Sequence, residues 1–176
     1  MACVLRNSSP FMKNDHRKQL RLPEFDYGSP GAYFVTVCTA DRRETLAEIR
    51  RGDPCGRPDV ILSELGAVAE SVFPKVEILY GVTFDCTVIM PDHIHFILFL
   101  PERRATARVA PTLGQIVGAY KSIVANEWRN MRPAGEITEK LWQRNFYEHV
   151  IRNETDLEET RRYIADNPSK WCETHL

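Results

Sequence analysis

Two histidines, His93 and His95, flank a single isoleucine in an apolar run that continues to Leu100. In an extended strand alternate side chains point to the same face, so the imidazoles project side by side, roughly 6–7 Å apart at their bases. Imidazole nitrogens bind divalent metals at about 2.0–2.1 Å, and two such rings can converge on one ion. The pattern therefore indicates a metal site that needs a third ligand, although a histidine pair satisfied within the core would have the same spacing.

A second pair of polar side chains, Tyr163 and Asn167, occurs near the end of the chain. Residues four apart on a helix are neighbours on one face, about 5–6 Å apart. Tyr163 lies off the centre of the apolar stripe that Leu157 and Ile164 define, so it is a candidate for chemistry. Packing at the helix flank for Tyr163, and helix termination before Pro168 for Asn167, are the more common explanations.

The elements that must position these residues follow from the pattern of apolar side chains. Strands are expected at about residues 33–39, 82–89, 93–100 and 142–151, and helices from 63 to 74, from 112 onward and from 155 to 167. The order βαββαβ matches the ferredoxin-like arrangement. We therefore expect an α+β fold with a four-stranded antiparallel sheet, two helices on one face, and a C-terminal helix that carries Tyr163.

Length and composition are those of a globular chain, with 176 residues, 43% hydrophobic and 27% charged residues, and a net charge of −1. We expect one domain at residues 31–176 behind a basic arm at 1–30, with a loop insertion at 51–59. No apolar run reaches about eighteen residues, and no signal peptide is evident. These features predict a cytoplasmic, nucleoid-associated protein with no membrane partner. The five cysteines form no Cys-x-x-Cys pair, which argues against a zinc ribbon or a disulfide framework.

Basic residues gather in two segments despite the balanced net charge. Residues 13–22 and 102–132 each hold a surplus of lysine and arginine that could contact phosphates. Solvated surface charge would produce the same surplus.

Several motifs occur in a fixed order: Arg21–Tyr27, Gly31–Thr36, Met90-Pro91-Asp92-His93-Ile94-His95, Trp142–Arg152 and Tyr163-Ile164-Ala165-Asp166-Asn167-Pro168. Together they resemble the REP-associated tyrosine transposases, within the HUH single-tyrosine (IS200-like) transposases. The resemblance runs from about Arg17 to Trp171. The chain has Asp92 where that family commonly has asparagine, a mild replacement that adds a carboxylate beside the histidines.

The resemblance implies a metal-dependent endonuclease and transesterase that cleaves and rejoins single-stranded DNA at REP-like hairpins. Tyr163 would attack phosphorus and leave a 5′-phosphotyrosine link, while His93, His95 and Asn167 would hold Mg²⁺ or Mn²⁺. The protein would act as a monomer or a homodimer. Contacts to DNA are expected from Arg17, Lys18, Arg21, Lys121 and Arg152.

Alternatives remain at several points. Tyr147 is a competing nucleophile. The group that assists loss of the phenol proton is open among metal-bound water, Arg161 and Arg162, and His149. Other functions compatible with the residues are a non-catalytic hairpin-binding protein of the same fold, a metal phosphohydrolase that uses water, and a small-ligand or RNA-binding module in which the histidines only pack.

Overall fold

The computed structural model describes residues 26–52, 58–102, 111–133 and 139–175. Most of the predicted basic arm, with Arg17, Lys18 and Arg21, lies outside these residues. So does the middle of the predicted 51–59 insertion.

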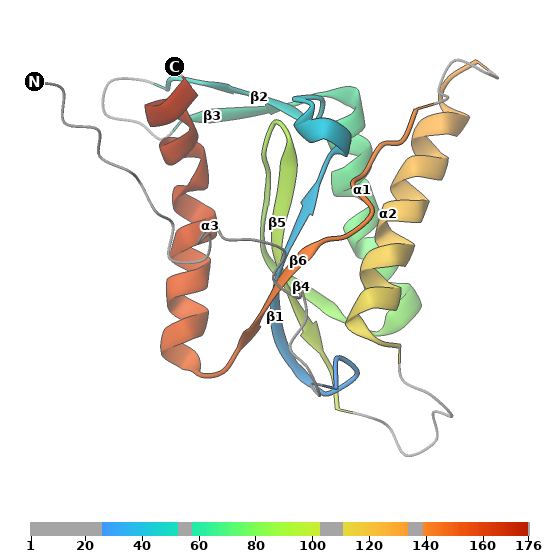
Figure 1. Ribbon diagram of the computed structural model, residues 1–176, viewed down its shortest axis with the longest axis vertical. Helices are drawn as coiled ribbons and strands as arrows, with labels where there is room; N and C mark the ends of the chain where they lie inside the picture. Colours follow the sequence, from blue (N-terminus) through green and yellow to red (C-terminus); the bar gives the residue numbers. More distant parts are fainter. Residues whose placement is uncertain (1–25, 53–57, 103–110, 134–138, 176) are drawn as a thin grey trace, which may run out of the picture.

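A four-stranded antiparallel sheet forms the centre of the molecule, with strand order β4-β5-β1-β6. The strands are β1 (Gly31–Cys38), β4 (Thr83–Ile89), β5 (His93–Leu100) and β6 (Tyr147–Ile151). Helices α1 (Glu64–Tyr80) and α2 (Leu113–Asn130) cover one face, and α3 (Glu154–His175) lies against the opposite face (Figure 1). The predicted ferredoxin-like α+β fold is therefore confirmed, and the helix that carries Tyr163 has one face of the sheet to itself.

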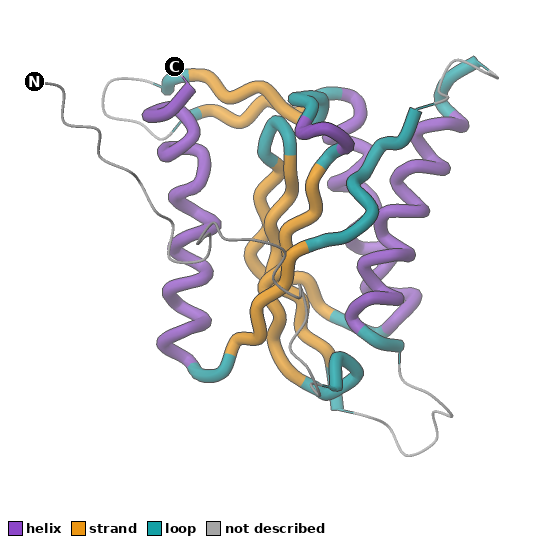
Figure 2. Tube along the Cα trace, in the orientation of Figure 1, coloured by secondary structure: helices purple, strands orange, loops and turns teal. Residues whose placement is uncertain are grey.

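A short second sheet lies beside one end of the central sheet (Figure 2). It pairs β2 (Ala47–Arg50) with β3 (Asp59–Leu62), which follow the 3-10 turn η1 (Ala40–Arg42). The expected loop at 51–59 includes the first residue of β3, and neither β2 nor β3 is among the strands expected from the sequence. Four-residue strands at the ends of a Pro- and Gly-rich segment give too short a pattern for the alternation of apolar residues to be visible.

The two faces of the sheet bury apolar clusters of unequal size. Beneath α1 and α2 the core includes Tyr33, Val35 and Val37 of β1 with Ile94, Phe96 and Leu98 of β5. Beneath α3 the buried set is smaller: Ala32, Phe34, Ile97, Leu157 and Ile164. Each large apolar side chain that is fully buried stabilises the fold by roughly 1.5–3 kcal/mol. Burial on both faces explains why β1 and β5 read as nearly continuous apolar runs.

Two helix starts agree with the sequence. The Ser63 hydroxyl caps α1 by accepting from Gly66 N, and Thr112 forms a capping box with Gln115 at the start of α2. The start of α3 differs, because the side chain of Asn153, and not that of Thr155, accepts a hydrogen bond from the first turn, at Asp156 N (2.9 Å).

The predicted helix ends at Pro74 and Pro168 are wrong. Both prolines lie inside helices that continue beyond them, to Tyr80 and His175. A proline inside a helix costs about 3 kcal/mol through a lost hydrogen bond and a clash. Packing after each proline offsets this cost: Val76 is buried in the core, and Trp171 lies beside His93.

Gly66 permits the close approach of α1 to the segment that precedes β2. Ser63 N and Ser63 Oγ both donate to the carbonyl oxygen of Leu46 (2.9 and 3.0 Å). A Cβ atom at Gly66 would overlap that carbonyl group. In α2, a Cβ atom at Gly118 would have no neighbour within 4 Å.

We expect Gly66→Ala to lower the free energy of unfolding by about 1–3 kcal/mol, because overpacking forces the backbone to shift. The control is Gly118→Ala, which removes a flexible glycine from an open helical site and should stabilise the protein by about 0.5–1 kcal/mol. Urea unfolding of both variants measures the difference. A gain in stability for Gly66→Ala would contradict the close approach.

Candidate functional site

The two histidines at the start of β5 converge on each other. His93 and His95 are 8% and 3% exposed, and their Nε2 atoms lie 3.0 Å apart. In the ladder with β1, His93 is paired with Cys38 and His95 with Thr36. The sequence prediction that both rings project from one face of a strand is therefore confirmed.

The other nitrogen of each imidazole has a partner of its own. Asp92 Oδ1 accepts a hydrogen bond from His93 Nδ1 (2.5 Å), and Thr36 Oγ1 shares a hydrogen bond with His95 Nδ1 (2.8 Å). The bond to Asp92 leaves the lone pair of His93 on Nε2. A threonine hydroxyl both donates and accepts, so Thr36 accommodates either tautomer of His95. Such partners fix the orientation of imidazole rings that bind metals.

Burial and local charges set the protonation of this cluster. Burial, together with the neighbouring His93, holds the pKa of His95 well below its ordinary value, so that ring is neutral at neutral pH. Burial opposes ionisation of Asp92, but the hydrogen bond with His93 and the charge of Arg42 lower its pKa. Arg42 Nη1 lies 3.3 Å from Asp92 Oδ2. Neutral imidazoles are the form that metals require.

The turn that carries Asp92 is held by the segment that follows β1. Pro91 O accepts from Thr45 N and Leu46 N (2.9 and 3.0 Å). Asp92 O accepts from Thr39 N and from Thr39 Oγ1, both at 3.0 Å. Four hydrogen bonds therefore fix the backbone immediately before His93.

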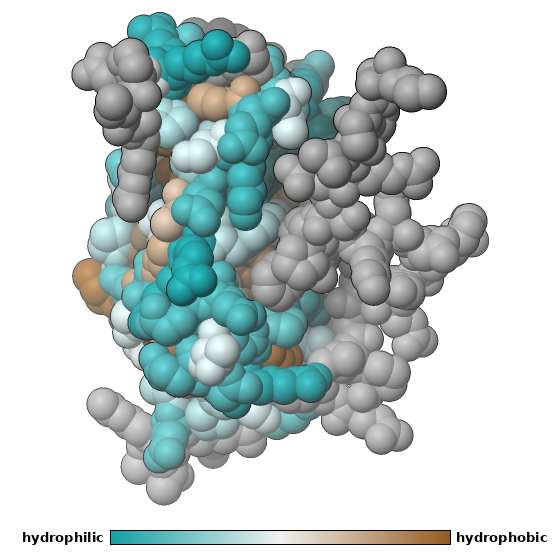
Figure 3. Space-filling model, turned by 90° about the vertical axis from the view of Figure 1, so that its left-hand side faces the viewer, coloured by the Kyte–Doolittle hydropathy of each residue, from teal (hydrophilic) through white to brown (hydrophobic). Residues whose placement is uncertain are grey.

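Helix α3 brings Tyr163 against the histidine cluster and buries Asn167. The Tyr163 ring lies 5.5 Å from the ring of His95 and 5.8 Å from that of Phe34, between ring centroids. Asn167, one turn further on, is buried. Lys170 Nζ lies 4.9 Å from the centre of the Tyr163 ring. The side of α3 that faces solvent is largely hydrophilic (Figure 3).

Lys121 lies on α2, across the sheet from the histidines. Its Nζ donates to three backbone carbonyls, those of Gln143, Arg144 and Asn145 (2.7, 3.2 and 3.4 Å). These bonds hold the segment before β6 against α2. A DNA contact by Lys121 stays a prediction, and it would compete with these three acceptors.

Three further candidates lie on β6 or between β6 and α3. Arg152 is exposed and precedes α3, whose first residue, Glu154, lies a helical rise of roughly 13–14 Å before Tyr163. His149 Nε2 lies 3.1 Å from both carboxylate oxygens of Asp156. Tyr147, the competing nucleophile, is 48% exposed on β6 and is paired with Thr36. Thr36 thus separates Tyr147 from His95, whereas Tyr163 is packed against that imidazole.

Sequence reasoning missed Thr36 and Arg42 as partners of the site. The identity of a cross-strand neighbour depends on the register of β1 against β5, which short-range patterns do not encode. Arg42 reaches Asp92 from η1, where Asp41 and Arg42 both have positive φ angles. This conformation is uncommon for residues other than glycine, so the sequence does not predict it.

The donor set fits a small divalent ion. Two nitrogens bound at right angles to one ion, with bonds of about 2.1 Å, lie about 3.0 Å apart, which is the separation of the two Nε2 atoms. Within the described ranges, no group of three His, Cys, Asp or Glu side chains could hold a metal. A third protein ligand from these ranges would therefore be of another type, such as the Asn167 amide oxygen.

Comparison with known proteins agrees with this fold. The family model described as "Transposase IS200 like" matches residues 54–167. An uncharacterized protein of Haemophilus influenzae is 30% identical over 92% of this chain and 93% of its own. A second protein of that organism, named a REP-associated tyrosine transposase, is 26% identical over 82% of this chain and 74% of its own. The chain belongs to the IS200-like transposase family.

Two solved structures share the fold. One is a REP-associated tyrosine transposase bound to a REP hairpin, with a TM-score of 0.53, 22% identity, and coverage of 90% of this chain and 74% of that chain. The other is a protein of Deinococcus radiodurans assigned as a transposase, with a TM-score of 0.51, 14% identity, and coverage of 88% and 97%. In the part of the chain that the structure describes, no helix has the length and apolar character to cross a membrane.

We expect Thr36→Val to lower the free energy of unfolding by about 1–3 kcal/mol, because His95 Nδ1 loses its partner in a buried position. Thr87→Val is the matched control, because Thr87 is exposed on β4, the strand on the other side of β5. Its replacement should change stability by less than about 0.5 kcal/mol. Urea denaturation compares the two. Equal, small effects would mean that the bond between Thr36 and His95 does not stabilise the site.

Proposed function

We propose that this transposase-family protein is a metal-dependent endonuclease and transesterase that cleaves and rejoins single-stranded DNA at hairpin sequences. The observation that carries the proposal is the packing of the Tyr163 ring 5.5 Å from His95, whose Nε2 lies 3.0 Å from that of His93. Membership of the IS200-like transposases, and the hairpin-bound relative of the same fold, support DNA as the substrate.

Tyr163 acts as the nucleophile in this proposal. Its phenolic oxygen forms a bond to phosphorus while the bond from phosphorus to the 3′ oxygen breaks. The products are a 5′-phosphotyrosine and a strand with a free 3′-hydroxyl. Because one phosphodiester replaces another, a 3′-hydroxyl can attack the tyrosine ester and rejoin the strands without ATP.

His93, His95 and the Asn167 amide oxygen would hold Mg²⁺ or Mn²⁺. When bound, the ion supplies positive charge that polarises the scissile phosphate and offsets the charge of the transition state. Asp92 and Thr36 keep the two imidazoles in position. The low pKa of His95 keeps that ring available as a neutral ligand.

The phenol of Tyr163 must lose its proton during attack, since a free phenol has a pKa near 10. Lys170 Nζ lies 4.9 Å from the ring centre and places a positive charge beside the phenol. His149 is paired with Asp156, and we assign it no step.

The DNA reaches the site over basic residues that balance its phosphates. Arg17, Lys18 and Arg21 of the N-terminal segment, and Arg152 at the start of α3, are the proposed contacts. Lys121 is the weakest member of the set, because its amine already serves three carbonyls on the other side of the sheet.

We expect wild-type protein to form a denaturation-resistant adduct with a single-stranded hairpin oligonucleotide from DNA that flanks the gene, in the presence of Mn²⁺. Tyr163→Phe removes the nucleophilic oxygen and should abolish the adduct. Tyr147→Phe, the matched control, should retain it. Denaturing electrophoresis of labelled oligonucleotide measures both.

The same experiment separates the alternative functions. Binding without cleavage by wild-type protein would indicate a non-catalytic hairpin-binding protein. Metal-dependent cleavage without an adduct would indicate a phosphohydrolase that uses water. An adduct that survives in Tyr163→Phe but disappears in Tyr147→Phe would move the nucleophile to β6.

Mn²⁺ should also raise the thermal stability of the protein in the absence of DNA, because a ligand bound only by the folded state stabilises it, by about 2.7 kcal/mol at a hundredfold excess over Kd. His93→Ala should lose the rise in Tm, while His149→Ala, with its histidine outside the ligand set, should keep it. EDTA should reverse the rise. A shift that is unchanged in His93→Ala would place the metal elsewhere.

A further inference from the structure

We propose that the last turns of α3 bind the nucleotide next to the scissile phosphate, with Trp171 stacking on its base and Lys170 contacting its phosphate. This inference rests on the proposed function, because it assigns a base-binding subsite to the same reaction. No function was assigned to either residue from the sequence.

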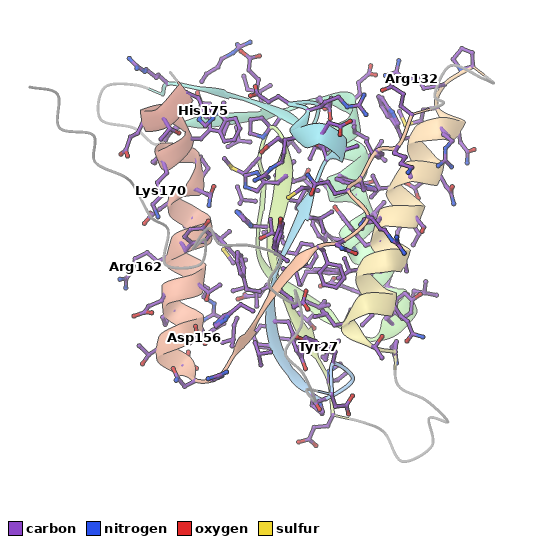
Figure 4. All side chains as sticks on the ribbon, in the orientation of Figure 1. Tyr27, Arg132, Asp156, Arg162, Lys170 and His175 are labelled. Atoms are coloured by element: carbon purple, nitrogen blue, oxygen red, sulfur yellow. The ribbon has the colours of Figure 1, made fainter. Side chains whose placement is uncertain are left out.

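The position of Trp171 follows from the stripe along α3. Leu157 and Ile164 are buried against the sheet, and Trp171 comes seven residues after Ile164, on the same side of the helix. Its ring lies 6.3 Å from that of His93, tilted by 44°. Lys170 and His175 come from the same end of α3, level with the end of the sheet where β4 turns into β5 (Figure 4). Trp171 therefore borders the histidine pair.

The second feature is the ring that lies on Trp171. The imidazole of His175 stacks on the indole at a centroid distance of 4.0 Å and an interplanar angle of 7°. Two parallel rings at this separation have the geometry of a base on an aromatic side chain. His175 is exposed on the last described turn of α3, where its Nδ1 lies 2.7 Å from Thr174 Oγ1 and 3.2 Å from Trp171 O. A base that stacks on the indole would replace this ring and these local contacts. Trp171 itself is partly exposed.

His175 follows Trp171 by four residues, so the helix brings the two rings together on one face. Their parallel stacking shows that this face of the indole accepts a planar ring.

Lys170 supplies the charge that this end of α3 needs. The C-terminal end of a helix carries partial negative charge, which repels phosphate, and Asp166 and Glu173 lie one turn away on either side. Lys170 is exposed, and its amine lies beside the Tyr163 ring. A phosphate held by this amine lies next to the proposed nucleophile, and its base lies next to Trp171.

The test uses full-length protein carrying Tyr163→Phe, so that binding is measured without covalent trapping. The probe is the hairpin oligonucleotide from DNA that flanks the gene, with 2-aminopurine placed in turn at each nucleotide around the cleavage position. We expect binding to quench one of these positions. Trp171→Leu should restore that fluorescence and weaken binding about tenfold, whereas Trp171→Phe should keep most of both effects.

Two further variants act on the partners of Trp171. His175→Ala uncovers the indole and should tighten binding of the same probe. Lys170→Met should lower the slope of log affinity against log salt concentration by about 0.7, the value for one phosphate contact on a single strand. If Trp171→Leu fails to fold, His175→Ala decides: tighter binding supports the inference, and unchanged or weaker binding overturns it.

The outcomes separate this inference from the proposed function. If the Tyr163→Phe protein binds the probe, wild type forms the adduct, and Trp171→Leu leaves affinity and quenching unchanged, the stacking role is wrong and the transesterase remains. If the protein neither binds the probe nor forms an adduct, the proposed function fails, and the subsite fails with it.

Discussion

Two imidazoles lie in close contact inside an apolar strand, and the surrounding structure has to satisfy both of them. Burying two polar rings is costly unless each nitrogen has a partner. Asp92 and Thr36 satisfy the outer nitrogens, and the two Nε2 atoms face each other at 3.0 Å. Satisfying both rings requires a fixed turn before β5, and the four hydrogen bonds to Pro91 O and Asp92 O provide it. The donors of these bonds lie between β1 and β2. This segment is held in turn by the start of α1, because Ser63 N donates to Leu46 O and Gly66 has no Cβ atom that would overlap this carbonyl.

The two faces of the sheet differ in how much apolar surface they bury, and this difference follows from the position of the histidines. The face under α1 and α2 buries the larger apolar cluster and supplies most of the stability. On the face under α3 the histidines occupy positions that apolar side chains could fill. The apolar cluster there is small and lies around Phe34, Leu157 and Ile164. A helix held by few apolar contacts opens at lower free energy than the rest of the fold. Under the proposed function, this property suits a helix that admits a DNA strand between Tyr163 and the sheet.

The sequence predicted the strand and helix order, the histidine pair and two of the three helix starts, because these depend on local patterns. It failed at Pro74 and Pro168, where packing further along the helix outweighs a local cost of about 3 kcal/mol. It also missed Thr36 and Arg42, which reach the histidine cluster through strand register and an unusual turn. Lys121 is a further case in which the sequence does not reveal the contacts of a side chain. It lies in a basic segment, yet its amine bonds three backbone carbonyls of its own chain.

Asp92 illustrates how a departure from a family pattern can be compensated locally. Where related transposases commonly have asparagine, this chain has a carboxylate that accepts from His93 Nδ1, as an amide oxygen would. The extra negative charge is not left unpaired in a buried turn, because Arg42 Nη1 lies 3.3 Å from the second oxygen. The pair keeps the geometry of the hydrogen bond and leaves the net charge beside the histidines close to that of the neutral amide. Because Arg42 pairs the charge that this carboxylate adds to a buried turn, the positive φ backbone of η1 that presents Arg42 is part of the site.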